Sequence, residues 1–340
     1  MVDSGEGVRW GIVGTGGIAR AFAKDLALLP DAVVGAVGSR SSEGADSFAA
    51  FLEESTGTRV ADAHRHASYD ALVSDDAVDA VYVATPHPGH ADAARLALEA
   101  GKAVLVEKPF TLNAAEAQEL VDLARSRGQF LMEAMWTRFL PHMGRVREIL
   151  ASGSLGDVVT VTADHGQWFE EDASHRLFAP ELGGGALLDL GIYPVSFASF
   201  VLGTPSRVTA RSSEAFTGVD ANTSILLEHA GGASALVSTT LSAATANVAA
   251  VNGTEARIEI DRTWYTPTSF RVTSRDGEVL ERYDQPHEGH GLRHQAAEVG
   301  RCLASGAPES ELLPLDETVA IMRTLDEVRS QIGLVYPQER

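Results

Sequence analysis

The chain has 340 residues, enough for about two domains, and 44% of them are hydrophobic. Its 27 basic and 47 acidic residues give a formal charge of −20, so no excess of Lys and Arg exists to neutralise phosphates, which argues against a nucleic-acid or anionic-membrane binder. The single cysteine, Cys302, excludes an intramolecular disulfide and a cysteine-based metal cluster. No signal peptide is recognisable, and no apolar stretch approaches the ~18 residues of a membrane helix, so we expect a cytoplasmic protein.

The first 130 residues alternate between short apolar runs and helical patterns. Strands are expected at 8–14, 32–39, 78–85 and 102–108, and an amphipathic helix follows each of them. Strands that alternate with helices imply right-handed crossovers and a parallel sheet. The sequence therefore predicts an α/β domain over residues 1–130.

A glycine loop joins the first strand to the first helix. The segment "GTGGIA" (14–19) matches the dinucleotide pattern, in which Gly14 permits the tight turn, Gly16 leaves room for a pyrophosphate and Ala19 lets helix and strand pack closely. The helix N-terminus would offer unpaired N–H groups to the phosphates. The alternative is a tight turn in another doubly wound fold. We expect a Rossmann domain whose cofactor contacts here are Gly14, Thr15, Gly16, Gly17 and Ile18.

The end of the second strand indicates which dinucleotide is used. NAD sites usually place an Asp or Glu there to bind the ribose 2′-hydroxyl, whereas this strand ends with Ser39 and Arg40, and Asp31 precedes the strand. A hydroxyl and a guanidinium suit a 2′-phosphate because Arg offers bidentate donors. An ordinary surface arginine is the competing interpretation. We expect NADP as the cofactor, with NAD as the less favoured alternative.

After residue 130 the pattern changes to short alternating runs. One helix is expected at 141–153, eight strand-like runs lie between 157 and 283, and two helices follow at 289–306 and 315–333. The sequence therefore predicts an α+β domain over 131–340 with a large, open, mainly antiparallel sheet. A sheet face rich in Val, Leu and Ala without enough helix to cover it favours a homodimer or homotetramer.

The segment "VLVEKPFTL" (104–112) places a charged pair at the carboxyl end of an apolar strand. Ligands bind at that edge of a parallel sheet, and a partly desolvated lysine has a lowered pKa, so Lys108 is a candidate acid/base. Pro109 restricts the backbone around Lys108. A strand-end lysine that reaches solvent is, on this stretch alone, an equally good interpretation.

A second stretch, "ELGGGALLDLGIYPVSF" (181–197), favours the catalytic interpretation. Asp189 and Tyr193 are four residues apart and would share a face of a helix, while the glycines allow the backbone to approach a ligand. A Tyr hydroxyl and a carboxylate beside a lysine form a set able to bind and deprotonate an alcohol.

Taken together and in order, "GIVGTGGIA", "TPHPGH", "VEKP" and "GGGALLDLGIYP" resemble the glucose–fructose oxidoreductase/inositol dehydrogenase (Gfo/Idh/MocA) family over essentially the whole chain. "MEAMWTRFLP" and the tail are similar to its dimeric dihydrodiol dehydrogenase/NADP-xylose dehydrogenase branch. The resemblance implies a Rossmann domain joined to an open-sheet domain that can mediate dimerisation. It also implies NAD(P)-dependent oxidation or reduction of sugars, cyclitols or diols with Lys108 as the acid/base. Tyr193 stands where many members have His.

Further contacts are expected around this site. The resemblance places Trp136 and Arg138 near nicotinamide and substrate, although Trp136 could be a domain-interface aromatic. Trp168 and Phe169 would wall the pocket or belong to the core of the second domain. Cofactor contacts at the carboxyl edge of the parallel sheet would come from Thr85, Pro86, His87, His90, Glu107 and Lys108. For His87 a solvated loop position, and for His90 a place at a helix start, are the competing interpretations.

The expected chemistry is hydride transfer between the nicotinamide and a carbinol carbon of a small polyol or sugar. Lys108 takes the hydroxyl proton, Tyr193 hydrogen-bonds the same oxygen or relays the proton, and Asp189 orients a substrate hydroxyl or Lys108. An NADPH-dependent keto-sugar reductase and a non-catalytic dinucleotide sensor remain as alternatives.

No metal site is expected. His64 and His66 lack a third ligand at suitable spacing. The tail histidines His287, His290 and His294 are taken as pocket-rim residues and not as ligands.

Overall fold

The computed structural model describes residues 7–284 and 288–340, which form two compact units. Residues up to Trp136 and the segment Glu288–Thr318 form the first unit, and the segments between and after them form the second. The sequence had assigned 288–318 to the second domain. Asp25, buried at the end of the first helix, accepts the backbone N–H groups of His290 (2.8 Å) and Leu292 (2.7 Å), which ties this segment to the first unit.

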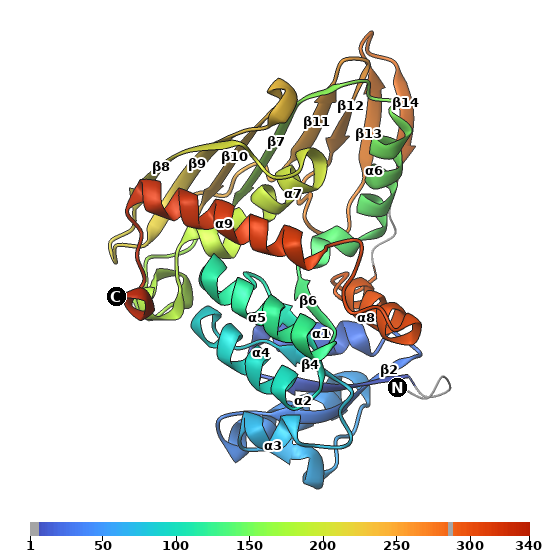
Figure 1. Ribbon diagram of the computed structural model, residues 1–340, viewed down its shortest axis with the longest axis vertical. Coiled ribbons are helices and arrows are strands. Elements are labelled where there is room, and N and C mark those ends of the chain that lie inside the picture. Colours follow the sequence, from blue (N-terminus) through green and yellow to red (C-terminus); the bar gives the residue numbers. More distant parts are fainter. Residues whose placement is uncertain (1–6, 285–287) are drawn as a thin grey trace. The chain divides into compact units, whose positions relative to one another are not determined.

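The first unit contains a six-stranded parallel sheet in the order β3-β2-β1-β4-β5-β6, the arrangement of a dinucleotide-binding Rossmann fold (Figure 1). The strands are β1 Val8–Val13, β2 Ala32–Gly38, β3 Arg65–His66, β4 Ala80–Val83, β5 Ala103–Glu107 and β6 Leu131–Ala134. The helices of this unit are α1 Gly17–Leu26, α2 Ser42–Thr56, α3 Tyr69–Val73, α4 His90–Glu99, α5 Ala114–Arg127 and α8 Arg293–Ser305. The predicted α/β fold is confirmed, with β3 and β6 as strands that the sequence did not suggest.

Local sequence signals set the ends of these elements. Asn113 caps α5 by accepting the Glu116 N–H at 3.0 Å, the Glu116 carboxylate accepts the Leu112 N–H, and Gly128 ends the helix with φ +63°. The core between α1 and the sheet is aromatic, because Phe22 stacks on Tyr82 with ring centroids 3.9 Å apart. Because the six strands are parallel, their carboxyl ends lie along one edge of the sheet.

The second unit contains an eight-stranded sheet in the order β14-β13-β12-β11-β7-β10-β9-β8. Its strands are β7 Val158–Gly166, β8 Arg207–Glu214, β9 Asp220–Glu228, β10 Ser234–Thr240, β11 Ala249–Gly253, β12 Ala256–Ile260, β13 Phe270–Ser274 and β14 Val279–Tyr283. All neighbours are antiparallel except β7 and β10, which run parallel. The predicted large, mainly antiparallel sheet is therefore confirmed.

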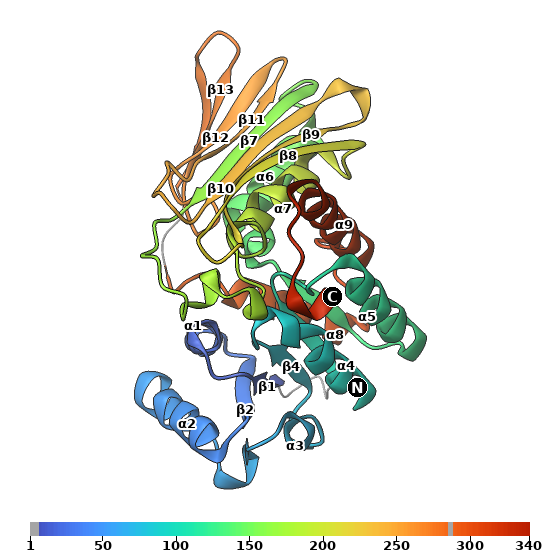
Figure 2. The ribbon, with the colours of Figure 1, turned by 90° about the vertical axis from the view of Figure 1, so that its left-hand side faces the viewer.

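Helices cover one face of this sheet. In Figure 2, α6 (Pro141–Ser152), α7 (Ile192–Leu202) and α9 (Leu315–Ile332) lie on the same side of it. In the part of the chain that the structure describes, the other face carries no helix. Leu236 there is 53% exposed.

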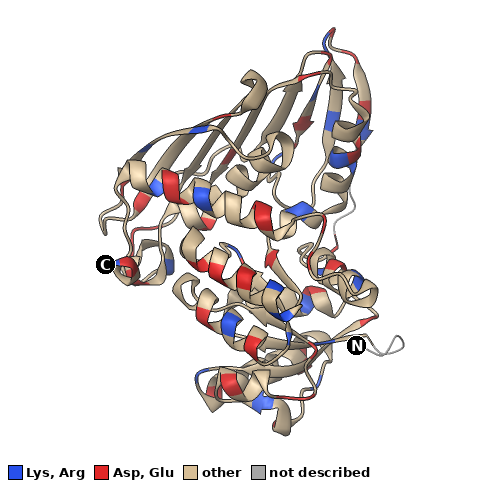
Figure 3. Cartoon of the chain, viewed as in Figure 1, with Lys and Arg blue, Asp and Glu red and all other residues tan. Residues whose placement is uncertain are grey.

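One stretch is longer and more apolar than the sequence analysis expected. The stretch Pro180–Leu202 has 23 residues and contains an 18-residue window with a mean hydropathy of 1.6, so by length and composition it could cross a membrane, but 83% of that window is buried inside the protein. Figure 3 shows Lys and Arg interleaved with Asp and Glu on the elements seen in that view.

Candidate active site

The glycine loop has the geometry that a pyrophosphate site requires. Gly14 has φ +98°, and a Cβ there would lie 2.5 Å from the Ala84 carbonyl oxygen, so only glycine fits. A Cβ on Gly16 would meet no protein atom within 4 Å, which leaves open space beside the start of α1. Gly16 is the N-cap of α1 and supplies no side-chain cap, so the first-turn N–H groups of α1 are available to an anion.

The end of β2 carries the residues expected to select the cofactor. Ser39 is buried and its N–H donates to His66 of β3 at 3.0 Å, while Arg40 is exposed. Burial raises the pKa of Tyr69, and the Arg40 guanidinium opposes that shift, so the two side chains are neighbours. Ser41 then caps α2. The described residues at this strand end thus present a cation and hydroxyls and no carboxylate.

Lys108 follows the last residue of β5. Its backbone N–H donates to the Glu107 carboxylate at 3.1 Å, and the peptide bond to Pro109 is cis. Glu107 is buried and also accepts the Tyr82 hydroxyl. Glu107 therefore holds the backbone of the turn that presents Lys108, and its predicted contact with cofactor stays a prediction.

His90 contacts the backbone of this turn and of the loop after β4. Its ring nitrogens lie 2.8 Å from the Pro109 carbonyl oxygen and 2.9 Å from that of Thr85. Burial lowers the pKa of His90 to about 3, and the nearby His87 and Lys108 add to the effect, so the ring is neutral and donates to one carbonyl at a time. His90 thus links the two strand ends where Thr85, Pro86 and Lys108 lie.

Trp136 and Arg138 belong to different units. Trp136 is the last residue of the first segment of the first unit and is 8% exposed. Arg138, in the second unit, donates to the Ser196 carbonyl oxygen at 3.0 Å and lies over the Phe200 ring at 4.8 Å. Arg138 therefore braces α7, and its predicted role toward cofactor or substrate stays a prediction.

The triglycine segment 183–185 forms a buried turn before α7. Gly185 has φ +115°, and a Cβ there would lie 2.2 Å from the Asp220 Oδ1 atom. The Tyr336 hydroxyl donates to the Gly184 carbonyl oxygen at 2.7 Å, and the Leu187 N–H donates to Asp220 Oδ2 at 2.8 Å. Burial raises the pKa of Asp220 to about 7, against hydrogen bonds from Thr223 and Leu187.

Asp189 lies in a π-helical turn, Leu187–Gly191, directly before α7. Single π turns are frequent at functional sites. Asp189 therefore lies in the π turn and Tyr193 in the α-helix that follows it, and their common helix face stays a prediction. The Asp189 carboxylate is buried and receives both arms of the Arg176 guanidinium, at 2.9 and 3.1 Å. Asp189 is therefore held as an anion in a fixed orientation.

Tyr193 is 7% exposed and belongs to a group of three rings. The His165 ring contacts it edge to face at 5.1 Å, and the Tyr265 ring lies 5.4 Å from it. His165 also stacks on Tyr265 at 3.8 Å. The second unit thus brings Tyr193 together with two residues that the sequence reading had not singled out.

The two predicted pocket-wall aromatics differ in their surroundings. Trp168 is 64% exposed. Phe169 packs against a small buried cluster that includes Leu177, Phe178 and Leu190. The competing interpretation of Phe169 as a core residue of its domain therefore has direct support, and Trp168 keeps the exposure that a binding surface needs.

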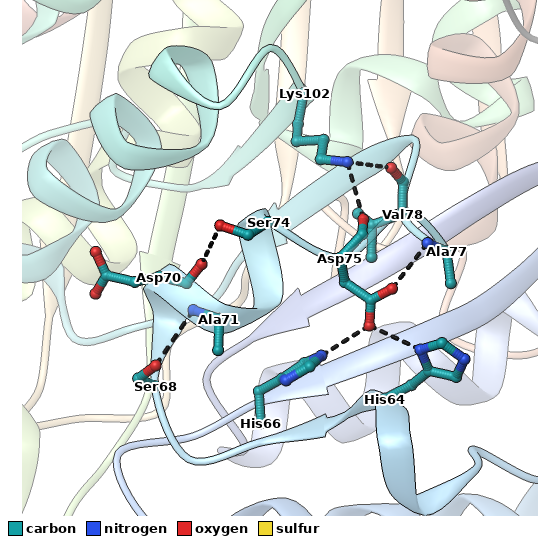
Figure 4. Close-up of polar contacts among 10 residues, drawn as sticks. All are labelled: His64, His66, Ser68, Asp70, Ala71, Ser74, Asp75, Ala77, Val78 and Lys102. Atoms are coloured by element: carbon teal, nitrogen blue, oxygen red, sulfur yellow. Dashed lines mark hydrogen bonds and ion pairs between the residues drawn. The ribbon is translucent and has the colours of Figure 1, made fainter.

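The pair His64 and His66 has a third partner that sequence spacing did not reveal (Figure 4). His64 Nδ1 and His66 Nε2 both lie 2.7 Å from Asp75 Oδ2. Burial would raise the pKa of Asp75, but the Ala77 N–H and the two histidines lower it to about 2. Among residues 7–284 and 288–340, no three His, Cys, Asp or Glu side chains are placed to bind a metal ion. His290 and His294 lie in the first unit, and His287 falls outside the described residues.

The sequence analysis did not identify four residues of the second unit as site residues: His165, Arg176, Asp220 and Tyr265. Each reaches the 183–193 segment across a long loop or from another strand, so no local spacing links them. The usable signal was the pair His165 and Gln167, which directly precedes Trp168 and Phe169 in the segment "DHGQWFEED". A buried histidine near a strand end needs a hydrogen-bond partner, and Gln167 lies two residues away.

Comparison with known proteins follows the same two parts of the chain. Residues 8–135 match the model of the oxidoreductase family with an NAD-binding Rossmann fold, and residues 143–259 match the GFO/IDH/MocA C-terminal domain. The chain is also 37% identical to D-xylose 1-dehydrogenase (NADP(+)) of Hypocrea jecorina, over 97% of this chain and 93% of that protein. The chain belongs to the Gfo/Idh/MocA oxidoreductase family.

Other members resemble the chain over its full length. Trans-1,2-dihydrobenzene-1,2-diol dehydrogenase of Mus musculus is 38% identical, covering 98% of this chain and 99% of that one. A 3-ketoreductase from Actinomadura kijaniata, solved with NADP and TDP-benzene, has a TM-score of 0.82 at 27% identity and covers 96% of this chain and 98% of that one. The predicted family resemblance is confirmed, and this Gfo/Idh/MocA protein is an oxidoreductase with a nicotinamide-binding domain.

Proposed function

We propose that this Gfo/Idh/MocA protein is an NADP-dependent oxidoreductase that transfers a hydride between the nicotinamide and a carbinol or carbonyl carbon of a sugar, cyclitol or trans-diol. The observation that carries the proposal is full-length similarity to an NADP xylose dehydrogenase and a diol dehydrogenase, together with Lys108 at the carboxyl edge of the Rossmann sheet. Such edges are where doubly wound sheets bind their ligands.

The residues of the first unit fit the cofactor. Gly14 and Gly16 would receive the pyrophosphate at the start of α1, and Ser39 with Arg40 would receive the 2′-phosphate. Thr85, Pro86, His87, Glu107 and Trp136 are the remaining proposed neighbours. Bound NADP would supply the hydride acceptor or donor, and the protein supplies orientation and electrostatics.

The proposed proton chemistry uses the side chains of Lys108, Tyr193 and Asp189. Lys108 takes the proton of the substrate hydroxyl during oxidation and returns it during reduction. The Tyr193 hydroxyl hydrogen-bonds the same oxygen, and the Asp189 carboxylate, held by Arg176, orients a neighbouring hydroxyl. Trp168, which is exposed, offers an apolar face to a carbohydrate or diol ring.

The opposite direction, reduction of a keto sugar by NADPH, is a second candidate. The structural similarity to a 3-ketoreductase favours it. The same residues serve both directions, because Lys108 in its protonated form is the acid that a carbonyl reduction needs.

A substrate panel tests the proposal. D-xylose, other aldoses, cyclitols and trans-dihydrodiols are assayed with NADP and NAD by absorbance at 340 nm, and keto sugars are assayed with NADPH. We expect at least one sugar or diol to be turned over with NADP preferred. A protein that binds NADP tightly but turns over no member of the panel would instead support the dinucleotide-sensing alternative.

We also propose that the enzyme is cytoplasmic and forms a homodimer or homotetramer. The assembly would form through the open face of the eight-stranded sheet. The support is a hollow of about 370 Å³ over β8, β9 and β10, lined by Leu226 and Leu236 among others, with Leu236 53% exposed. Light scattering at micromolar concentration should give a multiple of the 36.0 kDa chain mass, and Leu236→Glu should shift it toward the monomer. A wild-type monomer mass would remove this proposal.

A further inference from the structure

His165, Tyr193 and Tyr265 form a compact ring cluster in the second unit. His165 is the last residue but one of β7 and is 1% exposed, and its ring lies face to face with Tyr265 and edge to face with Tyr193. A phenylalanine could fill the same position without burying polar atoms. A buried imidazole needs a hydrogen-bond partner, so its presence here calls for a role that a plain hydrocarbon ring would not fill.

Gln167 supplies that partner. Its side-chain Nε2 lies 3.0 Å from His165 Nε2 and 3.4 Å from the Tyr265 hydroxyl oxygen. An amide nitrogen donates, so His165 Nε2 accepts this hydrogen bond. Burial raises the pKa of Tyr265, against the Gln167 hydrogen bond, while Asp164 raises it further and Arg262 lowers it. The Tyr265 hydroxyl is therefore protonated at neutral pH.

The backbone around the cluster is held from several sides. The Gly166 N–H and carbonyl each bond the Asn247 side chain at 3.0 Å, and the Thr137 hydroxyl donates to the Tyr265 carbonyl oxygen at 2.7 Å. Thr263, two residues before Tyr265, has φ +61°, a conformation that β-branched residues rarely adopt. Such strain persists where the surroundings over-determine it, and it clusters at functional sites.

We propose that His165, locked by Gln167 and stacked on Tyr265, is the positioning residue for the Tyr193 phenol in the reaction proposed above, on which this inference rests. The edge-to-face contact sets the tilt of the Tyr193 ring, and the ring tilt sets where its hydroxyl points. A hydroxyl displaced by about 1 Å from a reacting oxygen costs up to about 10²-fold in rate. Gln167 acts one step further back, by fixing the imidazole itself.

The test is a double-mutant cycle with a confirmed substrate. His165→Phe keeps a ring but loses the Gln167 hydrogen bond, and should lower kcat about tenfold while the KM for NADP stays within twofold. Tyr193→Phe should lower kcat on its own. If His165 acts through Tyr193, the double variant is no slower than Tyr193→Phe alone. Gln167→Leu should lower kcat less than His165→Phe, and Gln167→Glu should add an ionisation to the pH profile of kcat, because a carboxylate favours the charged imidazole.

His229→Phe is the matched control. His229 is also a buried histidine of the second unit, at the far end of β9 and β10. His165 pairs with Thr239 and Glu228 pairs with Ser234, so at least five strand residues, or about 17 Å, separate them. This variant should leave kcat within twofold of wild type.

Two results would overturn the inference. Losses from His165→Phe and Tyr193→Phe that multiply in the double variant would make His165 a structural residue only, as would a His165→Phe enzyme with wild-type kcat and pH profile. Wild-type turnover by Tyr193→Phe alone would count instead against the proposed role of Tyr193. The two failures are thereby distinguished.

Discussion

The carboxyl edge of the six-stranded sheet and the segment 183–193 of the second unit hold their side chains in different ways. Along the sheet edge, each residue is placed by the strand that ends just before it, as Lys108 is by β5. In the 183–193 segment, the partners come from far along the chain: Tyr336 reaches Gly184 across 152 residues and Asp220 reaches Leu187 across 33. Local sequence motifs determine the arrangement at the sheet edge, whereas the contacts of the 183–193 segment form only when distant parts of the chain come together.

The two regions should also differ in how they tolerate substitutions. A sheet edge tolerates changes in its loops because the backbone ladder sets the positions of the strand ends. The 183–193 segment depends on a few buried side chains, each of which leaves an unsatisfied polar group when its partner is removed. We therefore expect substitutions at the sheet edge to change chemistry and cofactor choice, and substitutions around the 183–193 segment to change chemistry and stability together.

Lys108 gives the largest expected effect and tests the sheet-edge half of the contrast. Lys108→Ala should lower kcat ~10²–10⁴-fold, the range for a general acid/base, with NADP binding by fluorescence titration within a few-fold of wild type. Lys102, at the other end of β5, is the matched control, because its ammonium donates to the Asp75 and Val78 carbonyls at 2.9 and 2.8 Å (Figure 4). Lys102→Ala should cost stability and leave kcat near wild type. Equal losses of kcat in the two variants would remove Lys108 from the chemistry.

The pH dependence of stability at Asp220 tests the prediction for the 183–193 segment. Its folded-state pKa of about 7 lies above the unfolded value of ~3.9, so the folded protein holds a proton that the unfolded chain releases. This contribution to stability is complete below pH ~4 and is lost as pH rises to about 7. Between pH 5 and pH 8, the wild type should therefore lose about 2–3 kcal/mol relative to Asp220→Asn, which does not titrate. Urea unfolding of both proteins at the two pH values measures the difference, and parallel pH dependences would contradict the prediction.

Arg40 sharpens the comparison at the cofactor end of the sheet. A charge-assisted hydrogen bond contributes about 1.5–3 kcal/mol, and the exposure of Arg40 shifts the expectation to the lower end. Arg40→Ala should raise the KM for NADP about tenfold and leave that for NAD within twofold, because NAD carries no phosphate there. Steady-state kinetics with both cofactors checks this, and equal losses for NADP and NAD would show that Arg40 does not read the 2′-phosphate.

Arg176 gives the smallest expected effect. Its side chain is 56% exposed, so solvent screens its pair with the buried Asp189. Arg176→Ala should lower kcat/KM about fivefold, and Arg176→Lys should recover only part of the loss, since an ammonium cannot reproduce the two-armed contact. Full recovery by Lys would mean that charge alone matters at this position.

The same contrast explains what the sequence could and could not reveal. The glycine loop, the Asn113 cap and the strand-end lysine follow from residue type and spacing, because short-range geometry determines them. The π-helical turn at Asp189 could not be foreseen, and neither could the contacts that Asp220 makes with Leu187 and Arg176 makes with Asp189, since none of them has a fixed sequence spacing. The parallel pairing of β7 with β10 inside an otherwise antiparallel sheet also lies outside what alternation of apolar residues can predict.

The assignment of residues 288–318 to the Rossmann unit has a consequence for recombination. The polypeptide passes from one unit to the other three times, after residues 136, 287 and 318. A chimera that exchanged only the first 136 residues with a relative would pair a foreign α1 with the native 288–292 segment, and Asp25 would have to be matched by the donor. Grafting the nucleotide preference of another family member onto this enzyme therefore requires two inserts and three junctions, or else point changes confined to 38–42.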